Sequence, residues 1–388
     1  MRHHNHDVVR EHAPLLGVII TLLSACEMGT LRDDIDCNQF GNCPLAPVQI
    51  SAGVSHTCAL YNNGTISCWG NNNHGQLGNS NTSSNYSSTP VNVDGLLDRA
   101  IAVASGGYHT CALLADTTVM CWGDNEAGQT GTIANDSQRT PILVSNLSTV
   151  SAIAAGYFHN CALLQDGTVK CWGQGGLGEL GNGATNDSNT PVAVTNLSYV
   201  MAITAHLGNH TCALTNMHGV KCWGLAEYGQ LGDGRTLTPD DIAATPVTVS
   251  GLSSGVAAIT AGIVHTCALL NSNGLKCWGN NDSGQLGNSS TTTSSTPLTI
   301  ISSDVLRVNA GSFNTFAWID NTLKCWGANG YGQLGDNTTI NRSYPVAVQA
   351  TSEEIIDITG GNQHTCAILA SGVIQCWGDN SSGQLGDW

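Results

Sequence analysis

The sequence contains few positive charges and few charged residues of any kind. Only 12 Lys and Arg stand against 28 Asp and Glu in 388 residues, and charged side chains make up 10% of the chain. Binding to nucleic acid requires cations that displace phosphate counterions, so nucleic acid is not an expected partner. The hydrophobic fraction of 41% is still sufficient for a buried core, which excludes wholesale disorder.

Sequence signatures of catalysis are also missing. The chain has no His-Glu-x-x-His and no phosphate-binding loop. We therefore expect a protein that is not an enzyme and that has no cofactor. Hydrolase or lyase chemistry in a central channel stays an alternative, since the carboxylates it needs would be gathered only by the fold.

Long hydrophobic runs are absent except near the N-terminus. Residues 13–25 form an apolar run that is shorter than the ~20 residues of a membrane-spanning helix. Its length suits a signal-peptide core, and Leu23-Ser24-Ala25-Cys26 directly after it resembles the bacterial lipobox. The alternative is a buried or cleaved apolar segment with an incidental cysteine.

These features predict three segments and a location. Residues 1–25 would be a lipoprotein signal peptide, residues 26–46 a tether lipidated at Cys26, and residues 47–388 the folded domain. The protein would then be extracytoplasmic and attached to the bacterial outer membrane or cell surface only through its lipid anchor.

One unit occurs seven times along the chain. Cys-Trp-Gly repeats with a mean step of about 51 residues. Its copies begin at Cys68, Cys121, Cys171, Cys222, Cys277, Cys325 and Cys376. Each unit reads as four short strands rich in β-branched or aromatic residues and bounded by turn residues. Seven such units predict an all-β, seven-bladed β-propeller, with a stacked solenoid as the alternative.

The repeated phrases resemble a known family. Ala-Gly-x-x-His-Thr-x-Ala-Leu, Gly-x-Val-x-Cys-Trp-Gly and Asn-x-x-Gly-Gln-Leu-Gly resemble the regulator of chromosome condensation repeat over residues 47–388. The resemblance implies a seven-bladed propeller. The cysteine of each Cys-Trp-Gly lies outside the general family pattern and looks like a modification for secreted members.

The ends of the chain predict how the ring closes. The repeat phase puts Pro90 and its equivalents in the first strand of each unit, so the first blade would lack that strand or take one from residues 43–46. The chain ends at Gly383-Gln-Leu-Gly, early in a further unit. We therefore expect the two ends to complement each other, as in propellers closed by pairing of their termini.

Cysteine spacing predicts a disulfide in most hairpins. Residues ten apart across a three-residue turn, such as Asn62-Asn63-Gly64, lie directly opposite each other within disulfide reach. The expected pairs are Cys58/Cys68, Cys111/Cys121, Cys161/Cys171, Cys212/Cys222, Cys267/Cys277 and Cys366/Cys376. Zinc is the competing interpretation, but there is no Cys-x-x-Cys and each pair belongs to a different blade. Cys37 and Cys43 are a further candidate pair within the tether.

The sixth unit departs from this pattern. Phe316 replaces its first cysteine, and only nine residues separate Phe316 from Cys325. An odd separation is expected to break the direct opposition across the turn, and Cys325 is expected to stay unpaired.

Other repeated residues have structural interpretations. The seven Trp of Cys-Trp-Gly would pack between blades. The six repeat histidines would bond backbone within each blade rather than bind a metal. The Asp- and Asn-rich loops would form turns rather than calcium sites. No metal is therefore expected.

The leading functional hypothesis is a lipid-anchored propeller that binds another macromolecule, either a protein or an extracellular glycan, as a monomer. An adhesive role or an inhibitor-like role is a narrower version, since one secreted member of the resembled family inhibits β-lactamases. Guanine-nucleotide exchange on a small GTPase, the activity of the family's founding member, is the alternative. No exchange residue of that member can be matched in this sequence.

Overall fold

The computed structural model describes residues 44–80, 84–133 and 136–387. All regular structure in this part of the chain is β-strand. In chain order the strands are β1 (Pro47–Ala52), β2 (His56–Tyr61), β3 (Ile66–Asn71), β4 (Tyr86–Asn92), β5 (Ala100–Ser105), β6 (His109–Leu114), β7 (Val119–Gly123), β8 (Gln138–Leu143), β9 (Val150–Ala155), β10 (His159–Leu164), β11 (Val169–Gly173), β12 (Ser188–Ala193), β13 (Val200–Thr204), β14 (His210–Thr215), β15 (Val220–Leu225), β16 (Ile242–Thr248), β17 (Val256–Ala261), β18 (His265–Leu270), β19 (Leu275–Gly279), β20 (Ser294–Ile301), β21 (Val305–Ala310), β22 (Asn314–Ile319), β23 (Thr322–Gly327), β24 (Arg342–Ala347), β25 (Ile355–Gly360), β26 (His364–Leu369) and β27 (Ile374–Gly378).

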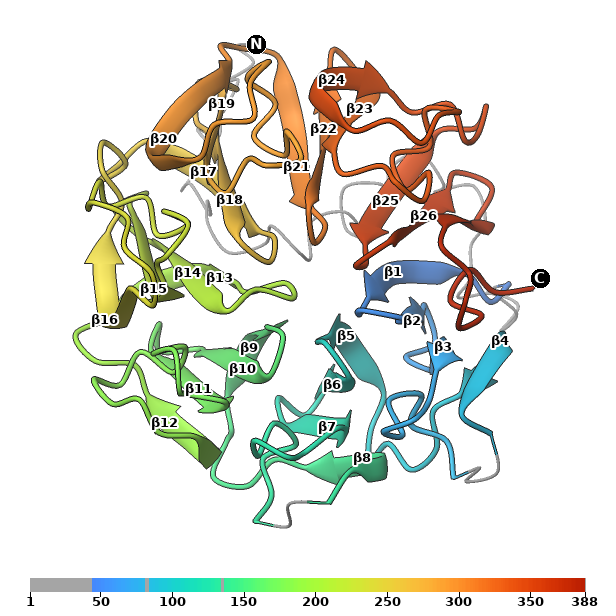
Figure 1. Ribbon diagram of the computed structural model, residues 1–388. Helices are drawn as coiled ribbons and strands as arrows, with labels where there is room; N and C mark the ends of the chain where they lie inside the picture. The colour runs from blue at the N-terminus through green and yellow to red at the C-terminus, as the bar shows by residue number, and fades with distance from the viewer. Residues whose placement is uncertain (1–43, 81–83, 134–135, 388) are drawn as a thin grey trace, which may run out of the picture.

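These strands form seven antiparallel meander sheets arranged around a central axis (Figure 1). The first strand of each sheet faces the axis and the fourth lies at the rim. The second strands are almost wholly buried, and His109–Leu114 is buried along its whole length, because neighbouring blades cover both faces. The fourth strands, such as Tyr86–Asn92, are half-exposed. The predicted seven-bladed β-propeller is confirmed.

Backbone geometry explains why the last residue of Cys-Trp-Gly is a glycine. Gly123 has φ 100°, a left-handed conformation that L side chains rarely adopt. A Cβ there would lie 2.5 Å from the carbonyl oxygen of Tyr108. The pairing register with the outer strand shifts beside this residue, between Cys121 and Gly123. The glycine therefore lets the third strand pass tightly under the loop that precedes the repeat histidine.

The predicted phase of the repeat was wrong. Pro90 lies in β4, which pairs with β3 as the outermost strand of the first sheet rather than opening the second. The first blade thus has all four strands. The seventh sheet, β25-β26-β27, has three within the described chain. The sequence motif marks the strand correctly but does not say to which neighbouring hairpin it bonds.

Ring closure also differs from the prediction. Within the described residues, no sheet contains strands from both ends of the chain. The C-terminal loop instead packs against the first blade, where Gln384 O accepts hydrogen bonds from Trp69 Nε1 at 2.9 Å and Thr57 Oγ1 at 3.2 Å. The same kind of contact joins every other pair of blades, so the closing interface is made like the rest.

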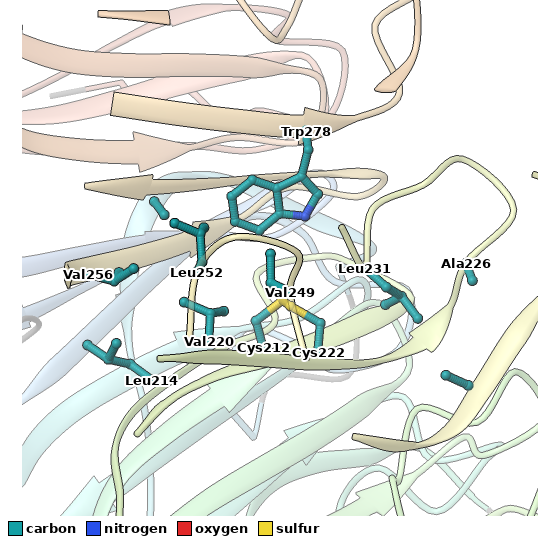
Figure 2. Close-up of a cluster of buried hydrophobic side chains, with 12 residues drawn as sticks. Cys212, Leu214, Val220, Cys222, Ala226, Leu231, Val249, Leu252, Val256 and Trp278 are labelled. Carbon is teal, nitrogen blue, oxygen red and sulfur yellow. A yellow bond between two sulfur atoms is a disulfide. The ribbon is translucent and has the colours of Figure 1, made fainter. Parts of the chain in front are cut away.

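Six of the seven interfaces between blades are built on a tryptophan and a disulfide, and the interface of the sixth and seventh blades has Phe316 and the free Cys325 in place of the disulfide. In Figure 2, Trp278 of the fifth blade lies over the Cys212–Cys222 disulfide of the fourth, with Val249 beside them. The indole N–H donates to Gln230 O of the fourth blade at 2.9 Å. Equivalent indole bonds occur at all seven interfaces, donated by Trp69, Trp122, Trp172, Trp223, Trp278, Trp326 and Trp377. The tryptophans pack between blades as expected. Each disulfide joins the two strands of its own hairpin and also belongs to the hydrophobic core between that blade and the next.

Candidate functional site

The twelve cysteines predicted to pair are joined in six disulfides. Each links directly opposed residues of the second and third strands of one blade, with Cα atoms 4.0 to 4.1 Å apart. The bonds are Cys58–Cys68, Cys111–Cys121, Cys161–Cys171, Cys212–Cys222, Cys267–Cys277 and Cys366–Cys376. The predicted lipidation site Cys26 and the candidate pair Cys37 and Cys43 lie outside the described residues.

Cys325 is a free, fully buried thiol, but its geometry corrects one expectation. Phe316 and Cys325 remain directly opposed despite their odd separation. The hairpin adapts by shortening its loop to two residues, Asp320 and Asn321, which both have positive φ. The thiol donates to Leu334 O at 3.0 Å, and burial raises its pKa far above the usual value. It is therefore a packed side chain rather than a reactive one.

The repeat histidines join neighbouring blades instead of bonding backbone within one blade. His56 Nε2 lies 2.9 Å from Thr110 Oγ1 of the second blade, whose hydroxyl donates to Gln76 O at 3.1 Å. The threonine proton is used by that carbonyl, so the imidazole donates through Nε2–H and its Nδ1 carries a lone pair. Among the described residues, Nδ1 has no partner in His56, His109, His210, His265 and His364.

These histidines are neutral in the folded protein. Burial lowers their pKa from 6.5, to about 3 for His56, His159 and His265 and to about 4 for His109, His210 and His364. In His56, His109, His265 and His364 a second proton would sit on a buried Nδ1 that has no acceptor. Their role is to hold blades together, and among the described residues no group of three or more His, Cys, Asp or Glu is arranged to hold a metal ion.

The central channel is narrow and partly closed from within. Its cavity of about 200 Å³ is lined by the inner strands, and its described lining holds no Asp or Glu. The connection between the first and second strands of the fourth blade is one residue longer than that of the third blade. Thr204 pairs with Cys212, whereas the equivalent Ala154 pairs with Cys161. The extended connection reaches into the centre in Figure 1, where His206 Nε2 donates to Gly360 O across the ring at 2.8 Å. An extra residue in one repeat was the signal that sequence reasoning missed.

Two faces of the ring are chemically different. We call the loop face the side formed by the described parts of the connections after the third strands (72–80, 84–85, 124–133, 136–137, 174–187, 226–241, 280–293, 328–341 and 379–387) together with the short connections that precede the repeat histidines. The hairpin face is the opposite side, formed by the hairpin turns and the connections that lead into each next blade. The antiparallel meander places these two sets of connections at opposite ends of every sheet.

Aromatic side chains gather on the loop face over the first three blades. Tyr157 and Phe158 pack edge-on with ring centroids 4.6 Å apart, and Tyr108 lies 5.8 Å from Tyr157. Tyr108 also stacks obliquely on His74 at 5.3 Å. These rings are half-buried and come from connections that no packing rule of the repeat requires to be aromatic.

The loop face is also strongly acidic. Its long connections carry thirteen Asp and Glu, of which all but the buried Asp124, Glu179 and Asp336 reach the surface, and a single Lys or Arg, Arg235, which is paired with Asp233 and Asp241. Glu126 and Asp282 are exposed there and Glu227 is half-buried. The hairpin face is closer to balance, because Lys170, Lys221, Lys276 and Lys324 lie at the hairpin end of the third strands. A macromolecule that approaches the ring thus meets a more negative surface on the loop face than on the hairpin face.

The Asp- and Asn-rich connections hold their own turns. Asn281 Oδ1 accepts from Leu286 N at 3.0 Å, and Asn281 Nδ2 donates to Ser290 O at 2.9 Å. Such bonds fix the long loops on the scaffold. In the same described region, no helix is long and apolar enough to cross a membrane.

Comparison with known proteins gives consistent family matches. A model described as the RCC1-like domain matches residues 30–317, and two models of the regulator of chromosome condensation (RCC1) repeat match residues 321–368 and 355–384. Human E3 ubiquitin-protein ligase HERC2 is 30% identical over 278 residues, covering 70% of this chain and 5% of that protein. Human probable E3 ubiquitin-protein ligase HERC4 is 30% identical over 258 residues, 65% of this chain and 19% of that protein. The chain therefore corresponds to a small part of these relatives.

Solved structures share the fold. The crystal structure of human WBSCR16 superposes with a TM-score of 0.76 at 22% identity, covering 84% of this chain and 88% of that one. Yeast RCC1 (Prp20), in its complex with Kap60, superposes with a TM-score of 0.74 at 23% identity, covering 82% and 78%.

Proposed function

The chain belongs to the family of regulator of chromosome condensation (RCC1) repeat propellers, and from this premise we propose that it is a lipid-anchored, extracytoplasmic module that binds another macromolecule. It would act without catalysis or a cofactor. Cys26 would carry the lipid, and residues 27–46 would connect the anchor to the ring.

The disulfides support the proposed location. Structural disulfides are typical of proteins in oxidising compartments, whereas cytosolic thiols are usually kept reduced, and this chain has six such bonds. An exported protein of this kind is separated from cytosolic GTP and its GTPases, which disfavours the exchange-factor alternative.

The acidic loop face is the observation that carries the binding proposal. It combines excess carboxylates with the aromatic cluster of Tyr108, Tyr157 and Phe158 on loops held by a rigid ring. Aromatic side chains are enriched in protein interfaces, and carboxylates attract a partner of opposite charge. The partner that fits best is a protein with a basic surface. The same charge disfavours nucleic acid.

The test of the binding face is a charge reversal with a matched control. In the first variant Glu126, Glu227 and Asp282 become Lys, and in the control the exposed Asp98, Asp116 and Asp166 on the hairpin face become Lys. The propeller is used as bait in envelope extracts at low and high salt. We expect a specific protein whose capture weakens at least tenfold in the loop-face variant and with salt, but not in the control.

Two results would contradict the proposal. Equal weakening by both variants would show that net charge, rather than the loop face, determines capture. Recovery of only a cytosolic GTPase would favour the exchange alternative. The anchor is tested separately by labelling cells with palmitate, and label that persists in Cys26→Ala would reject lipidation at this residue.

A further inference from the structure

A second surface feature lies on the hairpin face between the sixth and seventh blades. A pocket of about 580 Å³ is open to solvent there. Its floor is apolar and includes Trp318, Leu323, Val348 and Ile355. It is separate from the loop face. It forms where the sixth repeat departs from the sequence pattern of the other repeats.

The first cause is a substitution in the second strand. Trp318 pairs with Arg307 where the other six blades have Leu or Ile. Those residues are Leu60, Leu113, Leu163, Leu214, Leu269 and Ile368, and all are buried. Trp318 is only half-buried, so part of its indole faces the pocket.

The second cause is a missing leucine. In four blades a Leu lies three residues after the valine that directly follows the fourth strand, and it packs in the interface with the next blade; these are Leu96, Leu147, Leu197 and Leu252. In the sixth blade the same step from Val348 leads to Thr351. The smaller, polar side chain leaves unfilled the space that a leucine occupies elsewhere.

Two further departures shape the walls. Arg307 stands where blades two to five have alanine, at Ala102, Ala152, Ala202 and Ala258. Its guanidinium lies 5.7 Å from the Trp318 ring centroid and donates to Ile356 O at 3.1 Å. The shortened hairpin places Asn321 and Thr322 in the pocket lining. Four departures from the repeat thus meet at one place.

The pocket combines an aromatic surface with hydrogen-bonding groups of every type. The amide of Asn321, the hydroxyls of Thr322, Thr351 and Ser352, the guanidinium of Arg307 and the carboxylates of Glu353 and Glu354 surround the indole. We propose that this pocket binds one or two units of a neutral oligosaccharide. The apolar face of a pyranose would contact the indole and Leu323, and its hydroxyls would exchange hydrogen bonds with the rim.

Charged ligands fit the site less well. A cation would compete with Arg307, which already occupies one side of the indole. An anion would be repelled by Glu353 and Glu354, which outnumber the single guanidinium. A neutral, hydroxyl-rich ligand uses both signs of charge as hydrogen-bond partners without either penalty.

Calorimetric titration of the intact propeller tests this assignment. The probes are neutral trisaccharides of β-1,4-glucose, β-1,4-N-acetylglucosamine, α-1,4-glucose and α-1,2-mannose, with trilysine and trigalacturonate as charged comparators. We expect saturable binding of at least one neutral sugar. Thr351→Leu restores the leucine of the other blades, so it should weaken binding at least tenfold while the melting temperature stays the same or rises.

Further variants separate the explanations. Trp318→Leu should also abolish sugar binding, whereas Tyr331→Ala, at an exposed aromatic on the loop face, should leave it unchanged. Absence of binding by all four neutral sugars, stronger binding of either charged probe, or sugar binding that survives Thr351→Leu would overturn the proposal. Because no basic protein takes part in this assay, its outcome is independent of the loop-face proposal.

Discussion

Acidification from pH 8 to pH 5 should strongly destabilise this propeller. The six repeat histidines are buried and neutral, with pKa values of about 3 to 4 against 6.5 in an exposed imidazole. Their folded-state pKa values are lowered, so the unfolded chain binds more protons once the pH falls below about 6.5. Their contribution to stability is therefore complete above that pH and is lost as the pH falls toward 3 to 4.

The size of the effect follows from the pKa differences. At pH 5 each histidine lowers the free energy of unfolding by about 2 kcal/mol relative to pH 8, and the six together lower it by about 12 kcal/mol. Burial raises the pKa of Asp357 to about 6 and that of Glu179 to about 7. These two carboxyls have the opposite effect, because they bind protons at a higher pH in the folded state than in the unfolded state. At pH 5 they stabilise the folded state by about 4 kcal/mol relative to pH 8. A net loss on the order of 8 kcal/mol is comparable with the whole stability of a typical domain.

Urea denaturation with the disulfides intact measures this dependence. Near pH 5.5 the slope of the unfolding free energy against pH should correspond to an uptake of about four protons on unfolding. The chain provides its own control, since Asn314 replaces the histidine in the sixth repeat. His210→Asn should reduce the uptake by about one proton. An uptake of one proton or fewer, or a slope unchanged by His210→Asn, would refute the reasoning.

Three further predictions concern the interfaces between blades. Replacing Cys212 and Cys222 with alanine opens an eleven-residue loop and should lower the unfolding free energy in urea at pH 8 by about 2.5–3 kcal/mol; a loss below about 1 kcal/mol would show that the bond adds little to the hairpin. Trp278→Phe removes the indole N–H that bonds Gln230 O and should cost about 1–2 kcal/mol in the same assay, and a neutral result would mean that Thr266 satisfies the carbonyl alone. Cys325 should resist a thiol reagent in the native protein and react at the rate of unfolding, whereas immediate labelling would contradict its burial.

The sequence predicted the features that repeat, including the tryptophans that pack between blades, but it missed most hydrogen bonds that join one blade to the next. The ten-residue cysteine spacing was sufficient for six hairpins because a disulfide depends on local register. The strand that contains Pro90 was assigned to the wrong blade. It pairs with β3 of the first blade across a loop of 14 residues, and no local sequence pattern indicates that pairing. The turn of the sixth hairpin was wrong for a physical reason as well. A two-residue turn restores the opposition that an odd spacing would break across a three-residue turn.

The contacts between blades were less visible in the sequence. The motif residues His, Thr, Gln and Trp were all identified, yet their partners lie 30 to 56 residues away or across the closure of the ring. The backbone carbonyl of Gln76, which accepts from Trp122, has no sequence signature of its own. His206 and Thr351 could have been found by aligning the repeats, because one adds a residue and the other removes a leucine.

The sixth blade lacks the disulfide and also carries the pocket, and its packing explains why both are tolerated. Phe316 replaces the missing half-cystine and is fully buried, and its ring lies in the same cluster as Cys325, Leu334 and Trp377. A phenyl ring buries more apolar area than one sulfur atom. This burial offsets part of the stability that the sixth blade loses with its disulfide. Trp377 still donates to Gln333 O at 3.0 Å. The interface is therefore sealed toward the loop face and opens only toward the hairpin face, where Thr351 and Trp318 lie. The bond from Trp377 to Gln333, which joins the sixth and seventh blades, lies at the loop-face end of the interface, so the proposed ligand site at the hairpin-face end does not disturb it.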